Sequence, residues 1–201
     1  MSGDTSATAM PTSRLSTSFI CALRHHQARV SITQPTVRSQ GAGTLRAAWD
    51  FLSTDLDLRR LRSVTERKFL LRLDDATDLF ARRLQKQRGK GQSRKAGSWG
   101  VARKLLNIYI RDCVYSRMLC AHYRLEAIEP FLEVPLDSLV AKGLIAEANA
   151  RGQTRRLPRW KTIKGLERRE SDLFQSFASE LAEERGHARI HLDVVLWGAR
   201  E

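Results

Sequence analysis

Apolar residues recur at spacings of three and four along much of the chain, and this pattern constrains the fold more than any other feature. One set lies within residues 45–52, and a second covers four turns within residues 69–84. The members are Leu45, Ala48, Trp49, Leu52, Phe69, Leu70, Leu73, Thr77, Phe80, Ala81 and Leu84. Such spacing is typical of one face of an α-helix. No segment shows a run of alternating strand periodicity, so the sequence predicts a mainly α fold.

Further helices are expected after a polar, glycine-bearing loop at residues 85–97. A long helix is predicted for residues 101–122. Shorter helices are predicted for residues 137–149, 170–185 and 190–199, with Gly186 as the C-cap of the second of these three.

The N-terminal 43 residues differ in composition from the rest. No acidic residue occurs between Thr5 and Trp49, where five arginines lie among serines and threonines. A transit peptide, a flexible basic arm and an extended segment packed on a helical body all fit this composition. Because the segment shows neither a clear amphipathic helix nor a cleavage signal, we expect residues 1–43 to form an arm or extended segment and residues 44–201 to form a helical domain.

The chain is strongly basic, with 35 Lys and Arg against 22 Asp and Glu and a formal net charge of +13. Two runs concentrate this charge. Residues 79–111 hold ten bases and no acid, and residues 151–169 hold eight bases and one acid. Two such runs flanking a helical core are typical of a surface that contacts a phosphate backbone, and a solvated loop is the alternative. We expect Lys90, Arg94, Lys95, Arg103 and the adjacent Trp99 to contact DNA.

Three cysteines without a Cys-x-x-Cys pair predict neither a disulfide framework nor a metal site. No run of apolar residues approaches the 18 that a membrane span requires. The sequence therefore predicts a cytoplasmic, nucleoid-associated monomer with reduced cysteines. We expect no membrane association and no cofactor. Organellar targeting by the N-terminal arm is the alternative compartment.

Two segments carry the candidate chemistry. Residues 97–104 predict a tight glycine-containing turn that enters a helix, with Lys104 in its first or second turn. Backbone N–H groups at such a turn bind phosphate, and the helix dipole disfavours a charged amine there, which suits a nucleophile. Asp137 follows Pro135 at a helix N-cap position. Either residue alone has an ordinary explanation, as a phosphate contact or as a cap.

The two segments together resemble the helix-hairpin-helix DNA glycosylases. Residues 100–104 (Gly-Val-Ala-Arg-Lys) are similar to the family pattern Gly-Val-Gly-x-Lys, and residues 134–140 (Val-Pro-Leu-Asp-Ser-Leu-Val) are similar to Val-Pro-Val-Asp-x-x-Val. The separation between lysine and aspartate, 137 − 104 = 33 residues, resembles the archaeal 8-oxoguanine DNA glycosylase branch. So do residues 174–182 and 190–197, which are similar to its closing helices. The resemblance covers about half of the chain.

The resemblance implies roles for individual residues. Lys104 matches the lysine that attacks the sugar C1′, and Asp137 matches the aspartate that stabilises the cationic sugar. Asp193 and Trp197 match residues that line the base pocket, and Gly100 matches the hairpin glycine that meets a phosphate. In the family the residue one turn after the lysine is an aromatic that stacks on the base, but here it is Ile108. A further set of aromatic and histidine side chains is offered as pocket or wedge residues, with core packing as the alternative: Trp99, Tyr109 and His191.

These observations predict a DNA glycosylase that flips a damaged or modified base out of double-stranded DNA and excises it, with a possible lysine-dependent lyase step. The base is either an oxidised purine such as 8-oxoguanine or a hypermodified base of phage DNA, which would place the protein in repair or in antiviral defence. Ile108 tilts the choice away from 8-oxoguanine. Two other functions remain open: a non-catalytic helix-hairpin-helix DNA-binding module and a basic RNA-binding protein.

Overall fold

The computed structural model describes residues 16–198 except residues 39, 42, 64 and 87–97. The described residues form helices and connecting segments, with no strand among them, which confirms the predicted mainly α class. In chain order the elements are α1 Thr17–Ser31, α2 Thr44–Asp50, the π-helical η1 Phe51–Asp55, α3 Leu58–Leu61, α4 Glu66–Lys86, α5 Trp99–Tyr115, α6 Arg117–Tyr123, η2 Glu126–Phe131, α7 Ser138–Ala150, η3 Ile163–Gly165, α8 Arg168–Glu184, η4 Arg189–His191 and α9 Leu192–Gly198.

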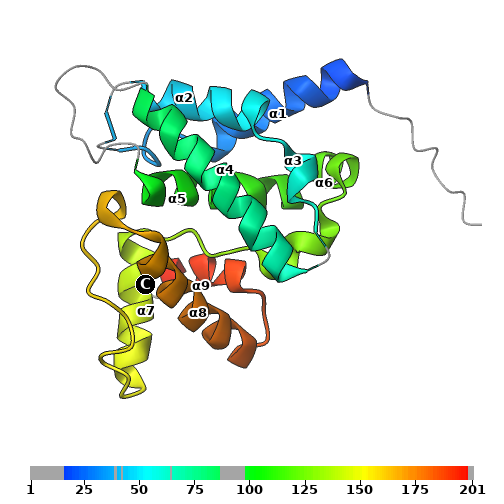
Figure 1. Ribbon diagram of the computed structural model, residues 1–201. Coiled ribbons are helices and arrows are strands. Elements are labelled where there is room, and N and C mark those ends of the chain that lie inside the picture. Colours follow the sequence, from blue (N-terminus) through cyan, green and yellow to red (C-terminus); the bar gives the residue numbers. More distant parts are fainter. Residues whose placement is uncertain (1–15, 39, 42, 64, 87–97, 199–201) are drawn as a thin grey trace, which may run out of the picture.

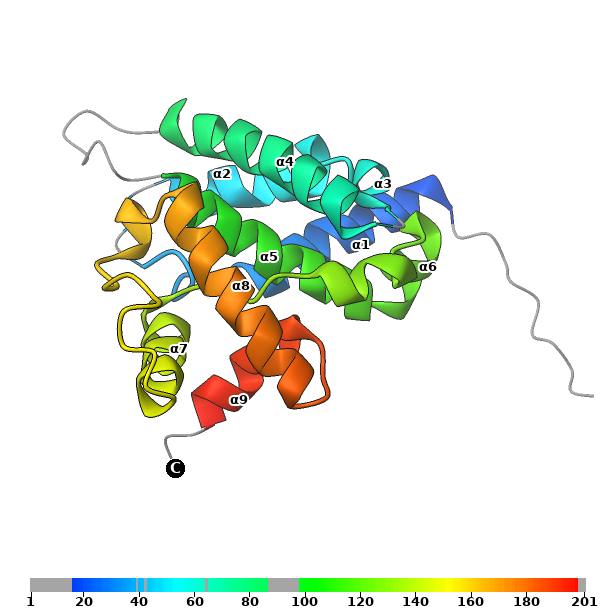
Figure 2. The ribbon, with the colours of Figure 1, turned by 60° about the horizontal axis from the view of Figure 1, so that its bottom comes forward.

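Two hydrophobic cores divide these elements. The first core is built from α1 to α6 and η2, and the second from α7, α8 and α9. In both views of the ribbon α7, α8 and α9 lie together on one side of α5, and α1 to α4 lie on its other side (Figures 1 and 2). Helix α5 therefore lies at the boundary between the two cores.

The chain crosses this boundary through residues 132–137, which we call the strap. Leu132 is buried in the first core, and Val134 and Leu136 are buried in the second. The strap ends at Asp137, whose side chain accepts hydrogen bonds from the backbone N–H groups of Leu139 and Val140 and so caps α7. This confirms Asp137 as an N-cap, a position that favours aspartate.

The structure corrects the expectation for residues 1–43. Residues 17–31 form helix α1, whose N-cap Ser16 accepts a hydrogen bond from the Phe19 N–H. Its buried face includes Ile20 and Ala28, and Ile32 directly after it is also buried. This face has few large apolar residues, so the sequence pattern did not indicate a helix that packs in the core. Residues 1–15 of the expected arm lie outside the described part of the chain.

The expected long helix over residues 101–122 is also corrected. It is interrupted at Ser116, whose backbone is extended at φ −78° and ψ 104°, and α6 begins at the next residue. Serine favours helix N-caps over helix interiors, which explains the break. The prediction for Gly186 is confirmed in substance: it adopts φ +71° directly after the last cap residue of α8. The His187 N–H donates to the Ala182 carbonyl and the Gly186 N–H to the Glu183 carbonyl, which is a Schellman motif.

Candidate active site

Helix α5 begins at Trp99, so residues 99–104 form its first turns and not the tight turn that was predicted. Gly100 is buried there, and a Cβ at this position would lie 2.5 Å from the Ile163 carbonyl oxygen and 2.7 Å from the Leu166 Cβ. The expected phosphate contact at Gly100 is therefore wrong for this structure. The glycine is needed because α5 packs directly against η3 and the residue that follows it.

Arg103 was expected to contact DNA, and the structure contradicts this. Its side chain is only 4% exposed and donates from Nε and Nη2 to both carboxylate oxygens of Glu133, at 2.7 and 2.8 Å. A further bond from Nη1 reaches Asp74 at 2.9 Å. Because two carboxylates neutralise it in the interior, Arg103 stabilises the boundary between the cores and is not free to bind a phosphate.

Trp99 was also expected to contact DNA, but its ring is engaged within the molecule. The guanidinium carbons of Arg103 and Arg168 lie 5.3 and 5.9 Å from the ring centroid, in cation–π range. The other expected DNA contacts, Lys90, Arg94 and Lys95, lie outside the described residues.

Lys104 and Asp137 are brought together as predicted. The Lys104 Nζ lies 3.4 Å from the Asp137 Oδ2, and the two side chains are 18% and 21% exposed. The other carboxylate oxygen, Oδ1, accepts the two capping hydrogen bonds from α7 at 2.9 and 3.1 Å. Because Oδ1 caps α7, the rotation of the carboxylate is fixed with Oδ2 facing the Lys104 amine.

This pair lines a cleft of about 350 Å³ at the boundary between the cores. One wall comes from α5, the start of α7 and η3. The opposite wall is the segment between α1 and α2. The lining residues are Pro35, Thr36, Arg38, Gln40, Val101, Lys104, Leu105, Asp137, Ser138, Leu139 and Ile163. Lysine and aspartate are thus partly buried, yet a ligand can reach them.

The lining residues Pro35, Thr36, Arg38 and Gln40 were missed by sequence reasoning, which assigned them to the arm. The Gln40 side chain is notable because it is only 5% exposed and its Oε1 has no hydrogen-bond partner among the described residues. Its Nε2 donates to the Arg38 carbonyl at 3.4 Å. A buried acceptor without a partner is costly, and because Gln40 lines the cleft, a rotation of its side chain would present this acceptor to a ligand.

Asp193 lies near the pair but is already engaged. Arg111, one of the residues that sequence reasoning missed, donates from Nη1 to the Asp193 Oδ2 at 2.7 Å. Burial raises the pKa of Asp193, Arg111 opposes that effect, and the charge of Asp137 reinforces it. The Asp193 carboxylate is therefore held by Arg111 in this structure.

Ile108 follows Lys104 by one turn of α5 and is partly buried against the first core. Among the described residues, neither Ile108 nor Asp193 lines the cleft around Lys104. Helix α9 contains Trp197 one turn after Asp193, but the Trp197 side chain lies outside the described part of the structure. The expected base-pocket roles of these three residues stay predictions.

Of the remaining pocket or wedge candidates, Tyr109 is fully buried in the first core, which favours the packing alternative. His191 of η4 lies next to the last residue of α5, where its Nε2 is 2.6 Å from the Tyr115 hydroxyl and 3.7 Å from the Glu129 Oε1 of η2.

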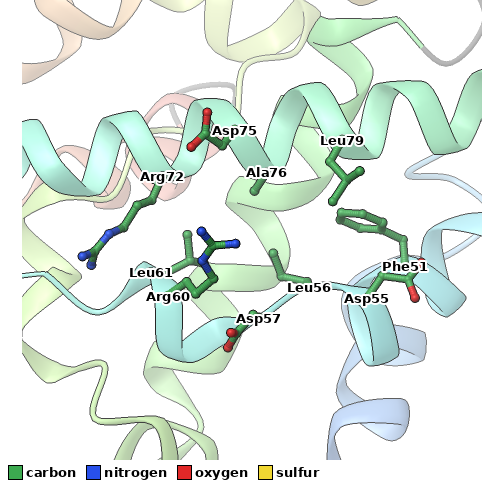
Figure 3. Close-up of a pocket in the computed structure, with 10 residues that line it drawn as sticks. All are labelled: Phe51, Asp55, Leu56, Asp57, Arg60, Leu61, Arg72, Asp75, Ala76 and Leu79. Carbon is green, nitrogen blue, oxygen red and sulfur yellow. The ribbon is translucent and has the colours of Figure 1, made fainter.

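A second cavity, of about 120 Å³, lies between α4 and the η1–α3 segment. Figure 3 shows Ala76 and Leu79 of α4 facing Leu56 and Phe51, with charged side chains at the rim. Its floor is apolar and its acids and bases are spread around the edge. The amine–carboxylate pair makes the cleft at Lys104 the better candidate for chemistry.

The described residues contain no group of three or more His, Cys, Asp or Glu side chains arranged to hold a metal ion. Nor does any helix among them have the length and apolar character needed to cross a membrane. Searches of family models, of curated proteins and of solved structures gave no match to the chain.

Proposed function

We propose that the protein is a DNA glycosylase whose reaction takes place between Lys104 and Asp137. The observation that carries this proposal is the approach of the Lys104 Nζ to within 3.4 Å of the Asp137 Oδ2 inside an accessible cleft. The two residues are 33 positions apart and come from different elements. Their pairing agrees with the roles that the resemblance to helix-hairpin-helix DNA glycosylases implies.

The pair supplies what cleavage of an N-glycosidic bond requires. The bond between the sugar C1′ and the base nitrogen breaks, its electron pair leaves with the base, and the base takes up a proton. Positive charge develops on the sugar, and the Asp137 carboxylate stabilises it. Either water adds to C1′ and gives up a proton, or the Lys104 amine passes its proton to Asp137 and forms the new C1′–N bond. The second course leads to a Schiff base and then to strand cleavage.

The cleft suits a nucleotide that has left the base stack. Its volume of about 350 Å³ lies within the range of small-ligand sites. The Gln40 Oε1, which has no partner among the described residues, would accept an N–H group of the base once its side chain rotates into the cleft. Bases in a duplex are inaccessible at C1′, so eversion into such a cleft is a necessary part of the proposal.

Basic segments next to the cleft fit a DNA backbone. The α1–α2 segment and residues 151–166 contain no acidic residue, and both lie at the end of α5 where that helix begins (Figures 1 and 2). Arg155, Arg159 and Lys161 of the second segment are exposed, as is Arg38 of the first. Within residues 151–166, Arg151 and Arg156 pair with acids of α8. The exposed bases are therefore the better candidates for phosphate contacts.

The aliphatic Ile108 sets the expected substrate range. An isoleucine offers no aromatic face for stacking, so we propose a substrate base other than, or broader than, 8-oxoguanine, including hypermodified bases of phage DNA. A role in defence is then as consistent with the residues as a role in repair.

The test is incubation with duplexes that each carry one modified base, followed by alkali to reveal abasic sites. Asp137→Asn is expected to lower base release by about 10²–10³-fold while duplex binding is kept, because charge stabilisation is lost but the surface is not. Lys142→Gln, which removes an exposed lysine of α7 outside the cleft, is the matched control and should act like the wild type.

Borohydride trapping then separates the two courses of the reaction. A covalent adduct that disappears in Lys104→Gln supports attack by the amine, whereas base release without an adduct supports water as the nucleophile. Duplex binding with no base released from any substrate would leave a non-catalytic DNA-binding module. Tighter binding of structured RNA than of duplex DNA in competition would favour the RNA-binding alternative.

A further inference from the structure

The strap that carries Asp137 is fixed by a side chain that the proposed chemistry does not use. Gln175 of α8 is only 3% exposed. Its Oε1 accepts the Val134 N–H at 3.1 Å, and its Nε2 donates to the Val134 carbonyl at 2.8 Å. A side-chain amide thus pairs with both backbone groups of one strap residue, as a neighbouring strand would in a sheet.

The preceding residue of the strap is fixed from the other side. Glu133 receives three hydrogen bonds from α5, two from Arg103 and one from the Asn107 Nδ2 at 3.0 Å. The strap is therefore held between α5 of the first core and α8 of the second. Arg103 and Lys104 are consecutive in α5, so the helix that holds Glu133 is also the helix that presents the amine.

Little freedom remains between the fixed point and the carboxylate. Only Pro135 and Leu136 separate Val134 from Asp137. The proline ring fixes its own φ near −65°, and Leu136 is 3% exposed in the second core. A shift of Val134 is consequently passed on to Asp137 and changes its separation from Lys104.

From this geometry we infer that Gln175 is a positioning residue for the reaction: it sets the register of the strap and thereby the distance between Asp137 and the Lys104 amine. This inference rests on the proposed function. A misplacement of about 1 Å in a catalytic group can lower a rate by about 10²-fold, which gives the scale of the effect.

The test compares Gln175→Met with Leu181→Ala. Methionine keeps the length of glutamine but makes neither bond to Val134. Leu181 lies six residues further along α8, is fully buried in the same core and has no polar side-chain atom. Leu181→Ala therefore weakens the packing of α8 without touching the strap bonds. We expect Gln175→Met to lower the single-turnover rate of base release by about 10²-fold with little change in the Kd for duplex, and Leu181→Ala to leave that rate within about threefold.

Gln175→Glu adds a readout that a merely structural role would not move. A protonated carboxyl group can replace the amide, since it both accepts and donates, but a carboxylate cannot donate to the Val134 carbonyl. Arg189 of η4 donates to the Gln175 backbone carbonyl and interacts in turn with Glu133 of the strap, Arg103 of α5 and Glu66 of α4. The rate of Gln175→Glu relative to the wild type should rise as the pH is lowered. A constant ratio across pH, or a wild-type rate in Gln175→Met, would overturn the inference.

A second measurement keeps the inference testable if the protein releases no base at all. A crystal structure of Gln175→Met is expected to show the Lys104 Nζ and the Asp137 Oδ2 more than 1 Å farther apart than the 3.4 Å of the native chain. An unchanged separation would refute the positioning role whatever the activity. The crystal structure therefore tests the positioning role of Gln175 separately from the proposed glycosylase activity.

Discussion

Arg103 and Lys104 are neighbours in the sequence, yet they belong to different regions of the molecule. Arg103 is 4% exposed and is held by Glu133 and Asp74 within the boundary between the cores. Lys104 is 18% exposed and faces one carboxylate across a cleft. Successive residues of an α-helix point about 100° apart, so one turn of α5 supplies both an internal support and a reactive surface. A basic residue next to a candidate nucleophile in the sequence, such as Arg103 beside Lys104, therefore need not share its function.

Removing each cation in turn is expected to have the largest effect on stability. Arg103→Met leaves the Glu133 carboxylate buried without its partner, which is expected to lower the free energy of unfolding by about 3–5 kcal/mol. Lys104→Met removes a partly exposed pair and should lower it by only about 0–1 kcal/mol. Urea denaturation followed by circular dichroism measures both. Equal losses in the two variants would mean that the two regions do not differ in the way described.

The pH dependence of stability should also differ between Glu133 of the buried network and Asp193. Burial alone would raise the pKa of Glu133, but Arg103, Arg189 and Asn107 together lower it below its ordinary value of 4.5. Ionised Glu133 therefore stabilises the folded protein fully above pH 4.5. This stabilisation falls by up to about 1.4 kcal/mol per pH unit as the pH is lowered toward the depressed pKa. Burial raises the pKa of Asp193, so its effect on the free energy of unfolding has the opposite sign: the protein loses stability as the pH rises.

Denaturation series at several pH values, with Glu133→Gln and Asp193→Asn as the matched variants, test these two signs. Relative to the wild type, Glu133→Gln should show a weaker loss of stability in acid. Asp193→Asn should show a weaker loss as the pH rises through the raised pKa. Parallel pH profiles for the wild type and Glu133→Gln would contradict the assignment of the buried network.

The helical class and the meeting of Lys104 with Asp137 could be predicted because local signals carried them. Apolar spacing of three and four marks α4 and α8, and an aspartate after a proline marks the cap of α7. The two motifs then placed the lysine and the aspartate at one site. The base-pocket role expected for Asp193 stays a prediction, and its ion pair with Arg111 was not foreseen.

What failed depended on long-range packing, which leaves no local signal. Gly100 has the sequence signature of a turn, but it is a glycine because η3 leaves no room for a side chain. Arg103 has the signature of a surface cation, but its partners Asp74 and Glu133 lie 29 and 30 residues away. Helix α1 buries Ala28 and Ser31 among polar residues, so its inner face could not be recognised before the first core was known.

Substitution of Gln40, which lines the cleft, is expected to have the smallest effect of the variants considered. Gln40→Leu replaces a buried acceptor that has no partner among the described residues with a group of similar size that needs none. The free energy of unfolding should stay the same or rise by about 1 kcal/mol, because the cost of the unpaired oxygen disappears. Base release from a substrate with an N–H group should fall by about tenfold, since a hydrogen bond to the bound base is worth about 1.4 kcal/mol or less. Thermal denaturation and single-turnover kinetics on the same samples measure the two effects. A variant that loses stability in parallel with activity would show that Gln40 is satisfied within the free protein, and the cleft would then lack its acceptor for the base.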